Sequence, residues 1–544
     1  MFRIVLVVLL LASTSLFSQD TKNTPQPIAS DPLNDASRLL PQGQFDVAIQ
    51  KYQQIIADNP KSSAAYAGLT RVYLKQENVR LADETITKGV QVADGPFVRV
   101  ALGEVYFREG KISDAEREWV NVINSGHIIA RAYLGLARIN ESLSFYKKAK
   151  DKLDKAHQLD PDDPDIQRWW GSTLSLSDRI KSLEEYLASV NNDDEKTRKS
   201  MQQYLDCLKA RQKNPHQSCK LVGKVTATET KLVPLTSDAQ HMIGMALSVT
   251  VNGAKSKLQL DTGASGILID RIIAAKAGLT KISEANIRGI GDQGDAAGWV
   301  GLANSVKIGD MEFQNCPVRV VDRRSVVDED GLIGSDVFSA FLVDLDFPDR
   351  KFKLTELPKR PGETDQSLAL NTRKQNGEGE DEDDDSTDSK SGSPGQRMFF
   401  DAYTAPEMKD YTKIFRFGHL LLIPTKVGDA SPKLFMIDTG AFGNSIDPAA
   451  AREVTHVAGD ADMRIEGISG KVNKVYSADN AMLLFGHLKQ PNQEMVSFDM
   501  TPVSNSVGTQ VSGTLGFSTL YLLDLKIDYR DGLVDLSWDP NRLH

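Results

Sequence analysis

The chain has 544 residues, and at about 100–200 residues per domain this length predicts several domains, each large enough to bury a core. The formal net charge of -10 argues against a sequence-independent nucleic-acid binder, which needs a basic surface to neutralise phosphates. We therefore expect no nucleic-acid partner.

Residues 1–18 have the pattern of an export signal. Arg3 precedes an apolar run from Ile4 to Ala12, and small polar residues then lead to Ser18. The run is too short to cross a bilayer as a helix. The sequence thus predicts a signal peptide over 1–18 and a mature protein, without stable membrane insertion, that is periplasmic or secreted, as in a bacterial envelope.

Between residues 38 and 190 the apolar residues recur at helical spacing, and the pattern itself repeats. Small residues mark the repeat: Ala48, Ala82, Ala115 and Ala149, separated by 34, 33 and 34 residues, and in parallel Gly68, Gly103, Gly135 and Gly171. We expect each glycine to begin a second helix that packs closely on the first. The pattern resembles the tetratricopeptide repeat, which implies an all-α solenoid with a concave face for a peptide or partner protein.

The three cysteines allow at most one disulfide. Cys207 and Cys219 close a short loop and are predicted to form it, whereas Cys316 is left unpaired. A catalytic thiol is disfavoured because no histidine stands in a recognisable pairing context. Residues 191–228 are interpreted as a connector.

After residue 229 the chain changes to short alternating apolar runs separated by glycines, which is typical of β structure. This alternating pattern covers residues 229–357 and resumes over residues 396–544. Residues 358–395 lack apolar periodicity, and residues 378–385 are almost purely acidic. The sequence therefore predicts two β lobes joined by a disordered acidic linker.

The two β segments repeat one another. An apolar strand, the turn Asp-Thr-Gly-Ala and a second apolar stretch ending in aspartate occur at Leu258–Asp270 and again at Phe435–Asp447. Each copy has a downstream partner: Gly331–Gly334 lies 70 to 73 residues after Asp261, and Gly513–Gly516 lies 75 to 78 residues after Asp438. A single Asp-Thr-Gly turn is common in β proteins, but two copies in matched context are specific.

These residues resemble the aspartic peptidases, and the Asp-Thr-Gly-Ala turns are most similar to those of retropepsins. The resemblance covers 229–357 and 396–544 and implies two β lobes, related by a pseudo-twofold axis, that face each other across a substrate cleft. It implies that Asp261 and Asp438 are the catalytic pair, with one shared proton, and that no metal or cofactor takes part. The supporting catalytic-loop residues that it implies are Thr262, Gly263, Thr439 and Gly440.

Several further residues take their expected roles from the same resemblance. Flaps that close over the substrate are expected at Gly289–Trp299 and Gly467–Tyr476. Ala264 and Ala441 lack the hydroxyl that pepsins carry at this position, so we expect higher pKa values for the pair and activity at weakly acidic to near-neutral pH. The substrate-subsite candidates are Ser265 and Phe442.

Other aspartates are expected to be structural. Asp270 and Asp447, which end the repeated motifs, are interpreted as turn carboxylates that bind local backbone amides. A solvated hairpin face is expected for the aspartates of the two later hairpins, namely Asp344, Asp346, Asp524 and Asp528.

The sequence thus favours an exported aspartic endopeptidase whose helical repeats recruit a protein substrate or partner. One alternative is a catalytically inactive scaffold that binds peptides or proteins, which Phe442 and the acidic linker favour and the two intact Asp-Thr-Gly turns disfavour. Another is a dimer in which each lobe pairs with a lobe of a second chain. The linker of about forty residues is long enough for both lobes of one chain to meet, so a single-chain pair is expected.

Overall fold

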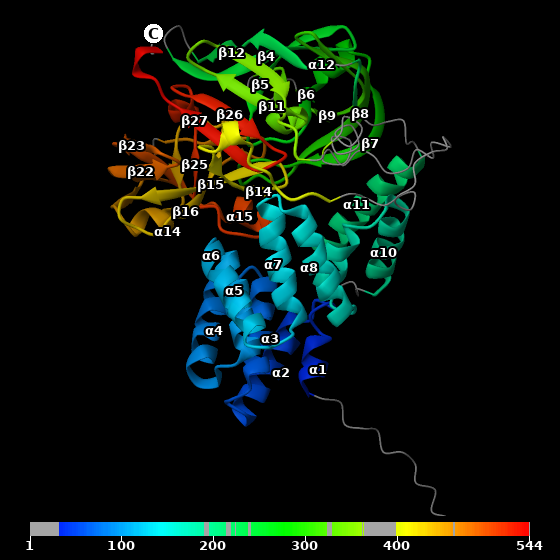
Figure 1. The fold of residues 1–544 in the computed structure, drawn as a ribbon, viewed down its shortest axis with the longest axis vertical. Helices are drawn as coiled ribbons and strands as arrows, with labels where there is room; N and C mark the ends of the chain where they lie inside the picture. The colour runs from blue at the N-terminus through cyan, green and yellow to red at the C-terminus, as the bar shows by residue number, and fades with distance from the viewer. Residues whose placement is uncertain are drawn as a thin grey trace, which may run out of the picture.

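The structure is a computed structural model that describes residues 32–189, 195–213, 219–223, 225–237, 241–323, 329–361, 363, 399–460 and 463–542. The expected signal peptide and the acidic segment at 378–385 lie outside these residues. Helices form the N-terminal region and two β lobes follow, as Figure 1 shows with the helices below the lobes. The predicted fold class is therefore confirmed.

The N-terminal region consists of antiparallel helices joined by short turns. They are α1 (Pro32–Ser37), α2 (Phe45–Asp58), α3 (Ser63–Lys75), α4 (Val79–Ala93), α5 (Pro96–Arg108), α6 (Ile112–Asn124), α7 (Ala130–Ser142), α8 (Tyr146–Leu159), α9 (Pro164–Gly171), α10 (Leu176–Ser189) and α11 (Glu195–Lys213). The segment predicted as a connector thus contains α11.

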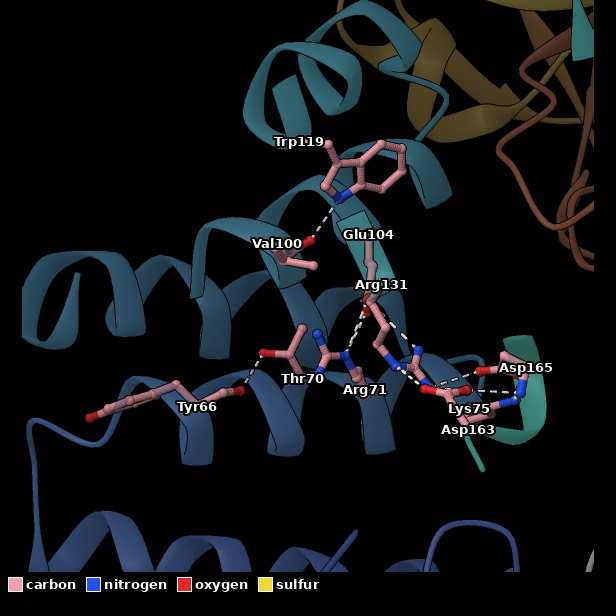
Figure 2. A network of polar contacts seen from close by, with 10 residues as sticks. All are labelled: Tyr66, Thr70, Arg71, Lys75, Val100, Glu104, Trp119, Arg131, Asp163 and Asp165. Carbon is pink, nitrogen blue, oxygen red and sulfur yellow. Dashed lines mark hydrogen bonds and ion pairs between the residues drawn. The ribbon is translucent and has the colours of Figure 1, made fainter. Parts of the chain in front are cut away.

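The repeated glycines permit close helix packing, but they do not begin their helices. Gly103 and Gly135 lie in the middle of α5 and α7, and a Cβ atom on either would collide with the indole of Trp119. Trp119 is fully buried between the two helices and donates from Nε1 to the Val100 carbonyl at 3.0 Å (Figure 2). The glycine positions are fixed by this aromatic contact.

Successive helices are also linked by a network of ion pairs (Figure 2). Arg131 of α7 binds Asp163 from Nε at 2.7 Å and Asp165 at 3.2 Å, and Arg71 of α3 binds Glu104 of α5 at 2.9 Å. Lys75 reaches Asp165 at 2.6 Å. Each cation of this network has a carboxylate partner, so the charges of the network are balanced.

The first lobe is built on a nine-stranded sheet in the order β1-β9-β6-β10-β5-β4-β8-β7, with β3 paired to β4. Its strands are β1 (Lys220–Leu221), β3 (Val233–Thr236), β4 (Met242–Val251), β5 (Ala254–Asp261), β6 (Ile267–Asp270), β7 (Thr280–Ile287), β8 (Ala296–Ile308), β9 (Met311–Val321) and β10 (Gly331–Gly334). Helix α12 (Arg271–Lys276) follows β6, and Asp270 caps it by accepting the Ile273 N–H at 2.7 Å. This confirms the structural role predicted for Asp270.

The second lobe is built on a ten-stranded sheet in the order β18-β21-β24-β17-β25-β16-β15-β22-β23, with β14 paired to β15. Its strands are β14 (Phe415–Phe417), β15 (Leu420–Val427), β16 (Lys433–Ile437), β17 (Ser445–Ile446), β18 (Val457–Gly459), β21 (Val475–Ala478), β22 (Ala481–Phe485), β23 (Leu488–Asn492), β24 (Met495–Phe498) and β25 (Gly513–Leu515). Its helices are α14 (Pro448–Arg452), α15 (Thr501–Val507) and α16 (Phe517–Leu520). Asp447 caps α14, as predicted, by accepting the Ala449 N–H at 2.9 Å.

A six-stranded sheet joins the two lobes. Its strands in order are β13 (Thr412–Lys413), β27 (Leu533–Ser537), β26 (Asp524–Asp528), β11 (Phe341–Asp346), β12 (Lys351–Glu356) and β2 (Ala227–Lys231). The central pair, β11 and β26, brings one strand from each lobe together in antiparallel register, and Figure 1 shows the red C-terminal strands beside green β11. Both lobes of one chain are therefore held face to face.

This shared sheet overturns the prediction that its aspartates are solvated. Asp346 and Asp528 are only 4% and 0% exposed. The prediction was wrong because it treated each hairpin as the edge of its own lobe, whereas each hairpin packs against the other. The predicted disordered linker is also ordered where it starts, since Arg360 is buried and forms an ion pair with Asp531 at 2.5 Å.

The disulfide prediction was wrong as well. Cys219 is bonded to Cys316, and Cys207 is an exposed free cysteine on α11. The short strand β1 pairs antiparallel with β9, placing Lys220 opposite Gln314 and the Cys219 and Cys316 Cα atoms 4.0 Å apart. A contact between strands about a hundred residues apart leaves no local signal in the sequence.

The helical region docks on the second lobe. Phe107 of α5 packs in one apolar cluster with Leu420, Leu434 and Met500. Its carbonyl accepts a hydrogen bond from the Thr509 hydroxyl at 2.6 Å, and Arg108 beside it binds Asn505 at α15. In the parts of the chain that the structure covers, no helix is long and apolar enough to cross a membrane.

Candidate active site

Each Asp-Thr-Gly turn is supported by the glycine-bearing strand that follows it in sequence. Strand β10 pairs in parallel with β5, with Gly334 opposite Asp261, and in antiparallel register with β6. Strand β25 pairs in the same two ways with β16 and β17. Gly334 lies so close to the Ala264 carbonyl that a Cβ atom would collide with it. The predicted duplication is therefore a duplication of local structure.

The two turns meet at the junction of the lobes. The Thr262 hydroxyl donates to the Ile437 carbonyl at 2.7 Å and accepts the Thr439 N–H at 3.0 Å. Reciprocally, the Thr439 hydroxyl donates to the Leu260 carbonyl at 2.8 Å and accepts the Thr262 N–H at 3.1 Å. Both threonines are buried, so the turns are cross-linked by four hydrogen bonds away from solvent.

This cross-link brings the Asp261 and Asp438 carboxyl groups into mutual hydrogen bonding. The neighbouring glycines make room for them, because a Cβ atom on Gly263 would lie 2.8 Å from the Asp438 carboxyl carbon and one on Gly440 would collide with the Asp261 carboxyl. Any side chain at either glycine would push the two carboxyl groups apart.

The surroundings raise the pKa values of both carboxyls. Burial raises the pKa of Asp261 well above its usual range, and the charge of Asp438 raises it further. Burial also raises the pKa of Asp438, but this carboxylate accepts the N–H groups of Gly440 at 3.0 Å and Ala441 at 3.1 Å, which stabilise its charge. The pair is therefore suited to hold one proton between its two carboxyl groups.

The two subsite candidates differ in their surroundings. The Ser265 hydroxyl donates to the Asp336 carboxylate at 2.9 Å, which also accepts the Gly266 N–H at 2.9 Å, so this side chain helps to hold the first turn in shape. Phe442 is 58% exposed. No ligand is present to contact either residue, and their subsite roles stay predictions.

Sequence reasoning missed two side chains that reach across the lobes to the catalytic turns. Gln259 of the first lobe donates to the Gly440 carbonyl at 3.3 Å, and Nε2 of His419 in the second lobe is 3.2 Å from the Gly263 carbonyl. Since a carbonyl only accepts, His419 must carry its hydrogen on Nε2. Burial lowers the pKa of His419, which favours the neutral ring. Gln259 lies within the first repeated motif, but the matching position of the second copy is Met436, and His419 lies outside the motif, so the repeat gave no signal for either residue.

The predicted flap segments contact each other at their tips. Between β7 and β8, the Ile290 carbonyl accepts the Ser469 N–H at 3.1 Å, and the Gln293 N–H donates to the Ser469 carbonyl at 2.8 Å. Ser469 lies between the short strands β19 (Glu466–Gly467) and β20 (Gly470–Lys471) of the second lobe. Ile468 at one tip and Ala264 of the first catalytic turn both pack against one apolar cluster of the first lobe, which includes Leu268.

Comparison with protein families agrees with this arrangement. Residues 247–337 match the family model described as aspartyl protease, and residues 39–96 match that of the tetratricopeptide repeat. The chain thus carries a segment similar to tetratricopeptide repeats ahead of a segment similar to aspartyl proteases. The aspartyl protease match includes the Asp261 turn and β10. The second lobe lies outside this match, and its strands β16 and β25 pair in the same parallel way as β5 and β10 of the first lobe. A comparison with curated protein sequences finds no match.

Proposed function

We propose that this chain is an aspartic endopeptidase that hydrolyses peptide bonds with a water molecule held between Asp261 and Asp438. The observation that supports it most strongly is the cross-linked pair of Asp-Thr-Gly turns, which couples two carboxyl groups with raised pKa values. Such a pair is ionised once near neutral pH, so it contains both an acid and a base.

The two carboxyl groups take different roles in the proposed reaction. The Asp438 carboxylate accepts a proton from the water as the water oxygen bonds to the peptide carbonyl carbon, and the Asp261 carboxyl gives its proton to the carbonyl oxygen. The tetrahedral intermediate then collapses: its C–N bond breaks as the nitrogen takes the proton held by Asp438, and one of its two hydroxyl groups returns a proton to Asp261, which restores the singly protonated pair. One water is consumed, and a carboxylic acid and an amine are released.

The remaining parts of the molecule have proposed roles around this reaction. The flap segments exclude bulk water from the cleft, and the tetratricopeptide repeats recruit the protein substrate or a partner. Residues 1–18 direct export, so that the mature chain acts in the periplasm or outside the cell.

The first test is cleavage of an unstructured protein such as casein by the purified mature chain between about pH 3 and pH 7. Because Ala264 and Ala441 offer no hydroxyl to the ionised pair and burial raises both pKa values, cleavage is expected to be fastest at weakly acidic to near-neutral pH. A chain that binds casein peptides but cuts none at any pH would instead be the inactive scaffold.

A further inference from the structure

A cavity of about 840 Å³ lies between the helical repeats and the second lobe. One wall comes from α7, α9, α10 and α11, and the other from residues 399–400, the β14–β15 turn and the end of α15; Figure 1 shows these elements meeting at the junction of helices and lobes. The lining is rich in aromatic rings, among them Phe107, Trp169, Tyr186, Tyr204 and Phe417.

The charged side chains of the cavity are strongly unbalanced. They are Arg138, Arg168, Arg179, Arg360, Arg416 and Glu141. Two of the arginines have structural partners, since Arg360 binds Asp531 and Arg416 donates to the Tyr529 carbonyl at 2.6 Å. For Arg138 and Arg168, no carboxylate within the described residues comes close enough to form an ion pair.

Two other arginines of the helical region have carboxylate partners. Arg131 lies two turns before Arg138 on the same face of α7, and it is neutralised by Asp163 and Asp165 (Figure 2). Arg71 is neutralised by Glu104. Arg138 and Arg168 thus differ from Arg131 and Arg71, whose charges are neutralised by carboxylates of neighbouring helices.

The guanidinium of Arg138 is placed to receive an anion. It lies 4.2 Å from the centre of the Phe107 ring and 5.5 Å from that of Trp169. Burial and the positive charge of Arg168 lower the pKa of Arg138 to about 10. The carboxylates of Asp165, Glu104 and Glu141 partly offset this shift, and a carboxylate bound directly to the guanidinium would add charge-assisted hydrogen bonds.

The cavity also reaches the candidate active site. His419 lines it and hydrogen-bonds to the carbonyl of Gly263, whose backbone forms the first catalytic turn. At this point, an occupant of the cavity would be separated from the first catalytic turn by the His419 side chain.

From these contacts we infer that the cavity is a docking site for an acidic peptide segment of the substrate protein, with carboxylates on Arg138 and Arg168 and apolar side chains against the aromatic rings. This inference rests on the proposed peptidase function. Charge complementarity favours an anionic occupant, because arginines outnumber carboxylates in the cavity lining, and the aromatic walls favour a peptide over a small inorganic ion.

Binding is tested in the full mature chain carrying Asp438→Asn, so that the result does not depend on cleavage. The probe is a fluorescein-labelled peptide of alternating glutamate and phenylalanine, and its control replaces each glutamate by glutamine. Arg138→Gln and Arg168→Gln are each expected to weaken binding about tenfold, by loss of a charge-assisted hydrogen bond. Arg117→Gln removes an exposed arginine of α6 outside the cavity and is expected to leave binding unchanged.

Equal binding of the glutamate and glutamine peptides, or unchanged binding in both arginine variants, would overturn the inference. Binding that appears only after residues 378–385 are replaced by a neutral sequence would assign the cavity to the chain's own acidic segment, and would also overturn it. Arg168 is exposed, so its variant remains informative even if Arg138→Gln impairs folding.

A second arm separates docking from the peptidase function. In the chain with both aspartates intact, casein carrying the acidic sequence as a terminal extension is expected to show a kcat/KM about tenfold above that of casein carrying the glutamine version. If both caseins are cleaved with equal kcat/KM, the substrate role of the cavity is contradicted while the peptidase function stands. If the acidic peptide binds in an arginine-dependent way but neither casein is cleaved, the proposed peptidase function is contradicted, and the substrate role of the cavity with it.

Discussion

At the scale of single residues, the threonines of the catalytic turns carry the most testable prediction. Thr262→Val keeps the shape of the side chain but leaves the Ile437 carbonyl and the Thr439 N–H without partners in a buried junction. We expect a loss of about 2 kcal/mol or more in the free energy of unfolding, measured by urea denaturation, and a fall in kcat/KM. Thr262→Ser keeps the hydroxyl and is the control. Equal stability of the two variants would contradict the assigned role.

The same scale shows what the sequence could and could not predict. Asp261, Thr262 and Gly263 were recognisable because each stands in a motif that the chain repeats. His419 and Gln259 were not, because their contacts to the opposite catalytic turn arise only when the lobes pack together. Cys219 pairs with Cys316 rather than Cys207 for the same reason, since β1 reaches β9 only in the folded sheet.

At the scale of elements, the contact between the flap tips makes a prediction with an internal control. Gly291 has φ of +130°, and a Cβ atom there would collide with the Gly470 carbonyl of the opposite tip. Gly291→Ala is therefore expected to separate the tips and raise KM about tenfold through a poorly closed cleft. Gly294→Ala is the matched control, because Gly294 also has a positive φ, +83°, but a Cβ atom there meets no atom within 4 Å. The same change in KM for both variants would trace the effect to backbone strain and contradict the tip contact.

The helical repeats and the two lobes were predictable at this scale because each has a period that recurs in the chain. Gly103 and Gly135 of the repeats were misplaced within their helices, since their positions are set by the Trp119 ring that they contact rather than by helix ends. The shared sheet was missed because β11 and β26 belong to different lobes and neither hairpin shows in sequence that the other covers it.

At the scale of the whole molecule, the shared sheet links stability to pH. Burial and the neighbouring Asp524 raise the pKa of Asp344 to about 7, against the opposing charges of Lys353 and Lys526. Because the folded-state pKa is raised, this carboxyl's stabilising contribution is fully present below the ordinary aspartate pKa and is lost as pH rises through about 7. Asp344→Asn is expected to flatten the decline in the urea midpoint between about pH 4 and pH 7. An unchanged decline in the variant would contradict the account.

The central claim is that one chain supplies both aspartates of one site, and the most direct measurement is a complementation assay. Asp261→Asn and Asp438→Asn are purified separately and tested for casein cleavage alone and after mixing. The account predicts that each variant loses at least about a thousandfold of the wild-type rate and that the mixture recovers none of it, because the lobes pair within a chain. Cleavage regained on mixing would show that lobes from different chains form the site, and would contradict the single-chain pair.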